Sequence, residues 1–338
     1  MIWLTWRQFR VQAVAVYTAV AAVAAIVAIT GPRLAELARI DANVFDRLTT
    51  ADRNLFYAGV VVMAVAPAVV GAFWGAPVVA RELEGGTHRL AWNQTVTRTR
   101  WLATKLGVTT LAAAAAAGLL TLAVTWWSAP LDGAASMTRG GLPSRLTPVT
   151  FAMRGVAPIG YAVFAVALGV AVGIVLRRSL AAVAVTLAVF TFVQIAMPLW
   201  VRPHLVAPAQ QTIAFTDANF DGIGMSGTSA RLRITVTTGN RGDWVLSNET
   251  VDATGQVVAL PSWVTDCLPP PVGRAAGGTV KATLRDCFAR LTDEGYRQRV
   301  TYQPADRFWT LQWAETALFL GLSGLLTGFS FWWIRRLA

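Results

Sequence analysis

Long stretches without a charged residue dominate the chain. Six windows contain no Asp, Glu, Lys or Arg and are rich in small and aliphatic residues: 11–32, 54–80, 106–131, 155–176, 179–201 and 316–334. A helix that crosses the hydrocarbon core of a membrane needs about 20 apolar residues and tolerates ionised groups poorly. The pattern therefore predicts six transmembrane helices, near residues 11–29, 57–79, 106–127, 156–176, 180–200 and 310–334.

Composition favours the same interpretation, since 55% of the residues are hydrophobic, only 14% are charged and the mean hydropathy is +0.50. Buried helices of a large soluble protein are the alternative, but they would need far more polar helix to cover them. The first window could also be a cleaved signal peptide. Its apolar run exceeds the usual length of about 7 to 15 residues, and no clean A-x-A site precedes Gly31-Pro32, which favours an uncleaved anchor.

Basic residues beside the spans predict the orientation, because Lys and Arg are retained on the cytoplasmic side. With both termini inside, the inner segments carry eleven basic residues in 43 positions, whereas the short outer loops carry seven in 55. Arg177-Arg178 and Arg335-Arg336 are the clearest markers. We therefore expect a multi-pass protein of the cell membrane with a cytoplasmic N-terminus and C-terminus. The net charge of +11 then reflects attraction to anionic lipid, and no nucleic-acid motif accompanies it.

Residues 201–308 form the one long polar stretch, which is too long for a structureless loop. Residues 231–237 alternate in the manner of a strand, 244–246 and 255–258 are further strand candidates, and 276–290 has the pattern of a helix. The predicted fold is an all-α polytopic membrane protein of six transmembrane helices, with a small α+β extracytoplasmic domain between helices 5 and 6. The predicted regions are a cytoplasmic amphipathic N-terminus (1–10), helices 1–5 (11–200), the extracytoplasmic domain (201–308), and helix 6 with a basic C-terminus (309–338).

Both cysteines of the chain, Cys267 and Cys287, lie in this predicted outer domain. An oxidising compartment permits a disulfide between them, and two free buried thiols are the alternative. A zinc site is not expected, because the two histidines lie on opposite predicted sides and no C-x-x-C is present.

The usual signatures of catalysis are missing from the sequence, so no enzymatic activity is expected of this chain. A phosphate-binding G-x-x-x-x-G-K-[ST] loop needs a lysine after glycine, but the two lysines, Lys105 and Lys281, follow Thr104 and Val280. ATP and Mg²⁺ must therefore be bound by a partner chain if they are used. Glu315 is the one carboxylate close to the interior of a predicted span. It is a candidate gate or substrate contact, or an interfacial residue paired with Arg154 or Arg307.

The predicted inner loop at residues 81–105 combines acidic, basic and aromatic side chains. A basic retention loop would explain the arginines alone, so the mixture favours a surface that docks a partner. Gly85-Gly86-Thr87 could start a helix with Thr87 as its N-cap. The candidate docking residues are Arg81, Glu82, Glu84, Gly86, Thr87, Trp92, Arg98, Arg100, Trp101 and Lys105.

The run R-E-x-E-x-G-T followed by T-x-T-R-x-R-W-x-x-x-K at 81–105 resembles the loop after the second span in ABC-2-type exporter permeases. The closing Gln312-Trp313-x-Glu315 and Phe331 to Arg336 resemble a subgroup from high-GC bacteria. The resemblance implies a coupling helix within 81–105 that docks on a separate cytoplasmic ABC ATPase. It also implies two six-span subunits, identical or not, that together form the pathway.

We therefore expect the membrane-spanning permease subunit of an ATP-driven exporter, which would couple ATP hydrolysis in the partner to translocation of a substrate. The alternative is a membrane sensor or assembly protein whose outer domain binds a ligand. A stand-alone membrane enzyme ranks behind both for lack of a catalytic constellation.

Overall fold

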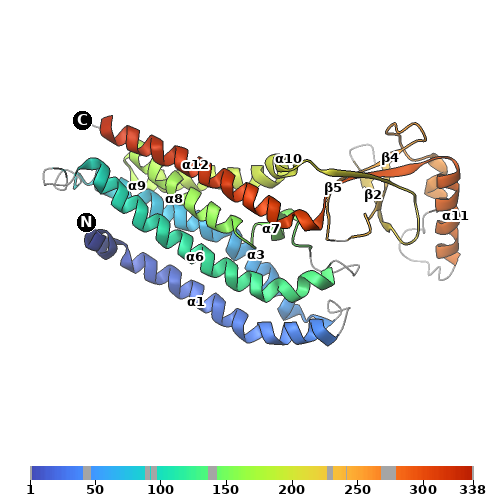
Figure 1. Ribbon diagram of the computed structural model, residues 1–338, viewed down its shortest axis with the longest axis horizontal. Coiled ribbons are helices and arrows are strands. Elements are labelled where there is room, and N and C mark those ends of the chain that lie inside the picture. The colour runs from blue at the N-terminus through green and yellow to red at the C-terminus, as the bar shows by residue number, and fades with distance from the viewer. Residues whose placement is uncertain are drawn as a thin grey trace. The chain divides into compact units, whose positions relative to one another are not determined.

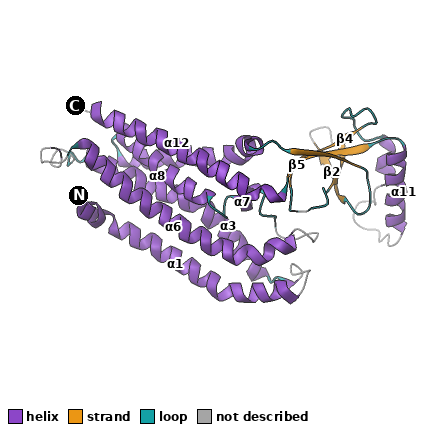
Figure 2. Cartoon of the chain, viewed as in Figure 1, coloured by secondary structure: helices purple, strands orange, loops and turns teal. Residues whose placement is uncertain are grey.

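The computed structural model describes residues 2–40, 47–87, 92, 97–135, 143–226, 231–240, 242–267 and 279–336. The chain divides into two compact units. Met1–Val206 and Phe308–Ala338 make up a helical unit, and Ala207–Arg307 make up an inserted domain. Strands within the described residues are confined to the inserted domain (Figure 2).

Six helical stretches are long and apolar enough to cross a membrane: Phe9–Ile40, Thr50–Glu84, Arg98–Asp132, Ala157–Leu176, Ser179–Leu205 and Ala305–Arg336. Each contains most or all of one predicted span, which confirms six candidate membrane-spanning helices. The helices lie side by side, and both chain ends lie at the same end of the helical unit (Figure 1).

The elements of the helical unit continue beyond the apolar windows. They are α1 (Ile2–Ile40), α3 (Thr50–Val70), the π-helix η1 (Gly71–Gly75), α4 (Ala76–Glu84), α6 (Arg98–Ala135), α7 (Pro148–Phe151), α8 (Ala157–Leu176), α9 (Ser179–Ala196), the π-helix η2 (Met197–Val201), α10 (Arg202–Leu205) and α12 (Phe308–Arg336). A capping box explains why α3 begins before the predicted residue 57. Thr49 Oγ1 accepts from the Asp52 N–H at 3.2 Å, and the Asp52 carboxylate accepts from the Thr49 N–H at 3.0 Å.

Helix α8 is the central helix of this unit, and α3, α4, α6, α9 and α12 all pack against it. Glycines allow the closest of these approaches. A Cβ added at Gly75 would lie 2.7 Å from the Val166 carbonyl oxygen, and one added at Gly173 would lie 2.7 Å from that of Ala76. These glycines belong to the small-residue patterns that suit close packing of membrane helices. The backbones of η1 and α4 therefore rest directly on α8.

The inserted domain contains two antiparallel sheets and a helix. In one sheet the order is β1 (Ala209–Ile213), β5 (Arg297–Gln303), β4 (Trp244–Val251), and the other pairs β2 (Phe220–Ser226) with β3 (Arg231–Val236). Helix α11 spans Thr279–Asp293, and the 3-10 turns η3 and η4 span Ser262–Cys267 and Ala305–Arg307. The apolar core is formed by Phe215, Ile234, Val236, Val264, Phe288, Leu291 and Val300. This domain is α+β, as predicted.

The strand predicted at 255–258 is wrong. Only an isolated bridge joins Val257 to Val251, because the chain turns between them. The Asp252 carboxylate accepts from the Thr254 and Gln256 N–H groups, and Gly255 has a φ of +81°. The predicted strands at 231–237 and 244–246 are found as β3 and β4. The predicted helix is found as α11, and its residues 276–278 lie outside the described residues.

Cys287 lies in α11. The side chain of Cys267, at the end of η3, lies outside the described residues. The pairing of Cys267 with Cys287 therefore stays a prediction.

Candidate functional site

The segment after the second span begins with the end of α4. Gly85 closes the helix by donating its N–H to the Arg81 carbonyl at 2.9 Å, and Gly86 has a φ of +68°. A left-handed glycine directly after the last turn is the usual way to end a helix. The expected helix with Thr87 as its N-cap would begin at residue 88, and residues 88–91 lie outside the described residues, so this expectation stays a prediction. Thr87 donates its hydroxyl back to the Glu82 carbonyl at 3.5 Å.

The Glu82 carboxylate joins the end of α4 to α6. It accepts from the Lys105 ammonium at 2.7 Å and from the Trp101 indole N–H at 3.0 Å. Lys105 also donates to the Val78 carbonyl at 3.1 Å, and its Nζ lies 5.3 Å from the centroid of the Trp101 ring. Trp101 and Lys105 are almost fully buried, so they present no surface to a partner in this structure.

The Glu84 carboxylate joins the same turn of α4 to the start of α9. Its Oε2 accepts from the Ser179 backbone N–H at 2.9 Å and from the Ser179 hydroxyl at 2.6 Å. The first N–H groups of a helix have no partner within that helix, and its positive end favours an anion. Glu84 therefore acts as the cap of a helix to which it does not belong.

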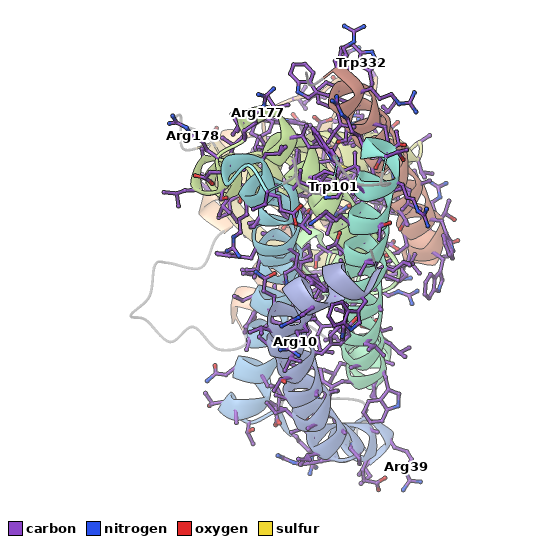
Figure 3. All side chains as sticks on the ribbon, turned by 90° about the vertical axis from the view of Figure 1, so that its left-hand side faces the viewer. Arg10, Arg39, Trp101, Arg177, Arg178 and Trp332 are labelled. Carbon is purple, nitrogen blue, oxygen red and sulfur yellow. The ribbon has the colours of Figure 1, made fainter. Side chains whose placement is uncertain are left out.

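Trp92 and Arg98 lie next to the cluster formed by Glu82, Trp101 and Lys105. Trp92 packs edge-on against Trp101 with 6.0 Å between ring centroids, and the Arg98 guanidinium lies 4.6 Å from the Trp92 ring centroid. Trp92 and Arg98 are half-buried, whereas Arg81, Thr87 and Arg100 are exposed. In the end-on view of Figure 3, Trp101 lies toward the interior of the bundle and Arg177 and Arg178 lie at its rim.

The predicted docking residues thus divide into two groups. Glu82, Trp101 and Lys105 hold α4 and α6 together, and Glu84 holds α9. The six others are exposed or half-buried: Arg81, Gly86, Thr87, Trp92, Arg98 and Arg100. The coupling helix itself was expected in a part of the chain that includes 88–91 and 93–96, which lie outside the described residues.

Glu315 of α12 is buried in a second polar cluster. Its carboxylate accepts from Arg202 Nε at 2.7 Å and from Arg202 Nη2 at 3.0 Å, and it also accepts the Tyr161 hydroxyl. The expected partners are wrong. Arg154 is paired with Asp132, and Arg307 donates to Gln303. Arg202 is the true partner because α10 and α12 pack together, which the sequence does not show.

Gln312 lies one helical turn before Glu315 and binds the segment that leads into α8. Its side-chain oxygen accepts from the Val156 and Ala157 N–H groups at 3.0 and 2.8 Å, and its nitrogen donates to the Phe151 carbonyl at 3.1 Å. Sequence reasoning assigned no structural role to Gln312, Arg202 or Tyr161. The spacing of Gln312 and Glu315, which puts two polar groups on one face of an apolar helix, was the available signal.

The family model described as ABC-2 membrane transporter related matches residues 8–202. The chain belongs to this family. The match includes both ends of the 81–105 segment, the first four candidate spans and most of the fifth, and it stops before the inserted domain and α12. No curated protein matches the chain, and no solved structure matches it.

Membership makes the protein a multi-pass membrane permease, the transport subunit of an ABC transporter. Permeases of this family are not themselves catalytic, and the family implies a partnership with an ABC ATPase subunit. The 81–105 segment of the permease, which carries the resemblance, is therefore the candidate functional site.

Proposed function

We propose that this permease couples ATP hydrolysis in a separate nucleotide-binding subunit to export of a substrate. The observation that carries the proposal is the base of the 81–105 segment, where Glu82 and Glu84 join one turn of α4 to two other helices. A movement imposed on this loop by a partner would reach α6 and α9 directly. Export rather than import rests on the resemblance to exporter permeases.

The proposed orientation puts the 81–105 segment, both termini and the α8–α9 turn in the cytoplasm. Exposed arginines at these places support it, namely Arg81, Arg100, Arg177, Arg178, Arg335 and Arg336. The inserted domain would then lie outside the cell. ATP and Mg²⁺ would be held by the partner, and two permease subunits, identical or different, would form the pathway.

ATP-driven closure of the partner subunits would push on the loop and change the packing of the spans between inward-open and outward-open states. Such a change requires groups of helices that move as rigid bodies. The direct backbone contacts of η1 and α4 with α8 would make these elements move together.

A sensor or assembly protein is the second candidate function. The inserted domain favours it, because this domain has its own apolar core and is large for a simple connection between two spans. In that case the 81–105 segment would bind a signalling partner.

Purification of the tagged permease from its native membrane in mild detergent distinguishes the two. An ABC ATPase that co-purifies in a stable ratio, with hydrolysis that depends on the permease, supports the proposed function. Recovery of a partner that does not bind nucleotide, in place of an ATPase, would reject it in favour of the sensor.

A further inference from the structure

The last turn of α4 carries two carboxylates that point to different neighbours. Glu82 and Glu84 are two residues apart, which corresponds to about 200° around a helix. Glu82 binds Lys105 and Trp101 of α6, and Glu84 binds Ser179 of α9. One turn of helix, at the end of α4, is thereby attached to both α6 and α9.

Helix α9 also contacts α4 one turn beyond Ser179. Ala76 and Ala80 of α4 form a buried cluster with Ala182, which lies one turn into α9. Small residues allow two helix backbones to approach closely. The start of α9 is thus held to α4 by a hydrogen-bonded cap at its end and by close packing beside it.

Much of the remaining surface of α9 is apolar and exposed in the single chain. The exposed large side chains are Leu180, Val185, Val189, Phe192 and Ile195. Its buried positions are Ala182, Thr186 and Phe190. Helix α9 also packs against α8, α3 and η1, and the Glu84 cap adds a specific polar contact between its first turn and α4.

We propose that Glu84 and Ser179 are a positioning pair that transmits movement of the end of α4 to α9, separately from the Glu82 connection to α6. The inference rests on the proposed function, because the movement would come from the ATPase. The pair sets the position of α9 relative to α4.

The experiment follows α9 and α6 separately in the permease–ATPase complex. Spin labels are placed at Phe192→Cys in α9 or at Leu111→Cys in α6, both exposed positions. The change in label mobility on adding ATP, Mg²⁺ and vanadate is measured at each site, after subtracting the signal of protein without an engineered cysteine. The quantity compared is the response at 192 divided by the response at 111.

Ser179→Ala removes the hydroxyl that Glu84 binds, and we expect this ratio to fall at least about twofold, as for other residues that couple distant sites. Glu84→Gln should lower it as well. Ser179→Thr keeps a hydroxyl and should restore it. Thr186→Val is the matched control, because Thr186 lies in the same helix and its buried hydroxyl has no hydrogen-bond partner among the described residues.

A ratio that stays at the wild-type value in Ser179→Ala would overturn the proposal. So would an equal fall at both labels, or an equal fall in Thr186→Val, since each would indicate a general loss of packing. If Glu84→Gln does not fold, the comparison of Ser179→Ala with Ser179→Thr still decides. If the wild-type permease captures no ATPase at all, the proposed function fails first, which is a separate outcome.

Discussion

Arg202 and Glu315, which are 113 residues apart in the sequence, form a two-point ion pair inside the helical unit, with 1% and 0% of their side chains exposed. The pair joins α10 to α12. Arg202 also donates to the Pro148 carbonyl at 3.2 Å and lies over the Phe151 ring, with 4.2 Å between its Cζ and the ring centroid. The pair thus connects three segments that are remote in the chain.

Removing one member of this pair should destabilise the permease strongly. Arg202→Ala would leave the Glu315 carboxylate buried without its cation, at a cost of about 3 to 5 kcal/mol. The double variant Arg202→Met with Glu315→Leu leaves no buried charge and should recover most of that loss. Thermal unfolding in detergent measures both. A single variant as stable as the wild type would show that the pair is not buried in the folded protein.

Docking of the ATPase should depend on the exposed and half-exposed residues of the 81–105 segment. Trp92→Ala and Arg100→Ala should each weaken capture, by about thirtyfold if the residue is an interface hot spot. Arg39→Ala, an exposed arginine paired with Glu36 near the end of α1, is the control. Titration of the ATPase onto immobilised permease gives the affinities. Equal capture by all three variants would indicate that the segment does not dock the ATPase and that its basic residues serve only to keep it on the cytoplasmic side.

The orientation predicts which surfaces meet an impermeant thiol reagent in intact cells. Ala218→Cys, at an exposed position of the inserted domain, should react from outside. Arg178→Cys, in the exposed α8–α9 turn, should react only after the membrane is permeabilised. Mass shift after labelling reports both. The reverse labelling pattern would show that the topology is the opposite of the one proposed.

A disulfide between Cys267 and Cys287 should survive purification without reductant. Closing a loop of about 20 residues stabilises a domain by roughly 3 kcal/mol in the chain-entropy model. Intact-mass measurement after denaturation and alkylation should show neither cysteine modified. Two added alkyl groups would mean that the bond is absent.

Lowering the pH should destabilise the turn at residues 252–256, which stands where a strand was expected at 255–258. Hydrogen bonds from the Thr254 hydroxyl and from backbone N–H groups, including that of Gln256, hold the pKa of Asp252 below its usual value. A lowered folded-state pKa contributes stability above the unfolded value of about 3.9, and this is lost as pH falls through the folded value. Asp252→Asn should therefore unfold earlier than the wild type at pH 6. The difference should shrink toward pH 2, as followed by urea unfolding, and a constant difference would contradict the assignment.

The six spans could be predicted because a charge-free window of about 20 apolar residues is long enough to cross a membrane as a helix. The helix ends could not, since they depend on local caps such as Thr49 with Asp52. The Gly85-Gly86 pair illustrates the difficulty. Glycine is compatible with either end of a helix, and only its left-handed φ at Gly86 shows that α4 ends there.

The candidate site was predictable as a segment but not as an arrangement. Its mixture of acids, arginines and tryptophans distinguished 81–105 from a simple basic loop. Which of these side chains turn inward depends on α4 packing beside α6 and α9, and that packing requires distant glycines and alanines. For the same reason Glu315 was identified as unusual, while its partner Arg202 was not.

The π-helix η1 has a further consequence for this arrangement. A π-turn accommodates one residue more than an α-helix of the same length, and each residue corresponds to about 100° of rotation. The five residues of η1 therefore set the rotational phase of α4 relative to α3. Loss of one residue there would convert the turn to ordinary helix and rotate Glu82 and Glu84 away from Lys105 and Ser179, although every side chain of the site would still be present.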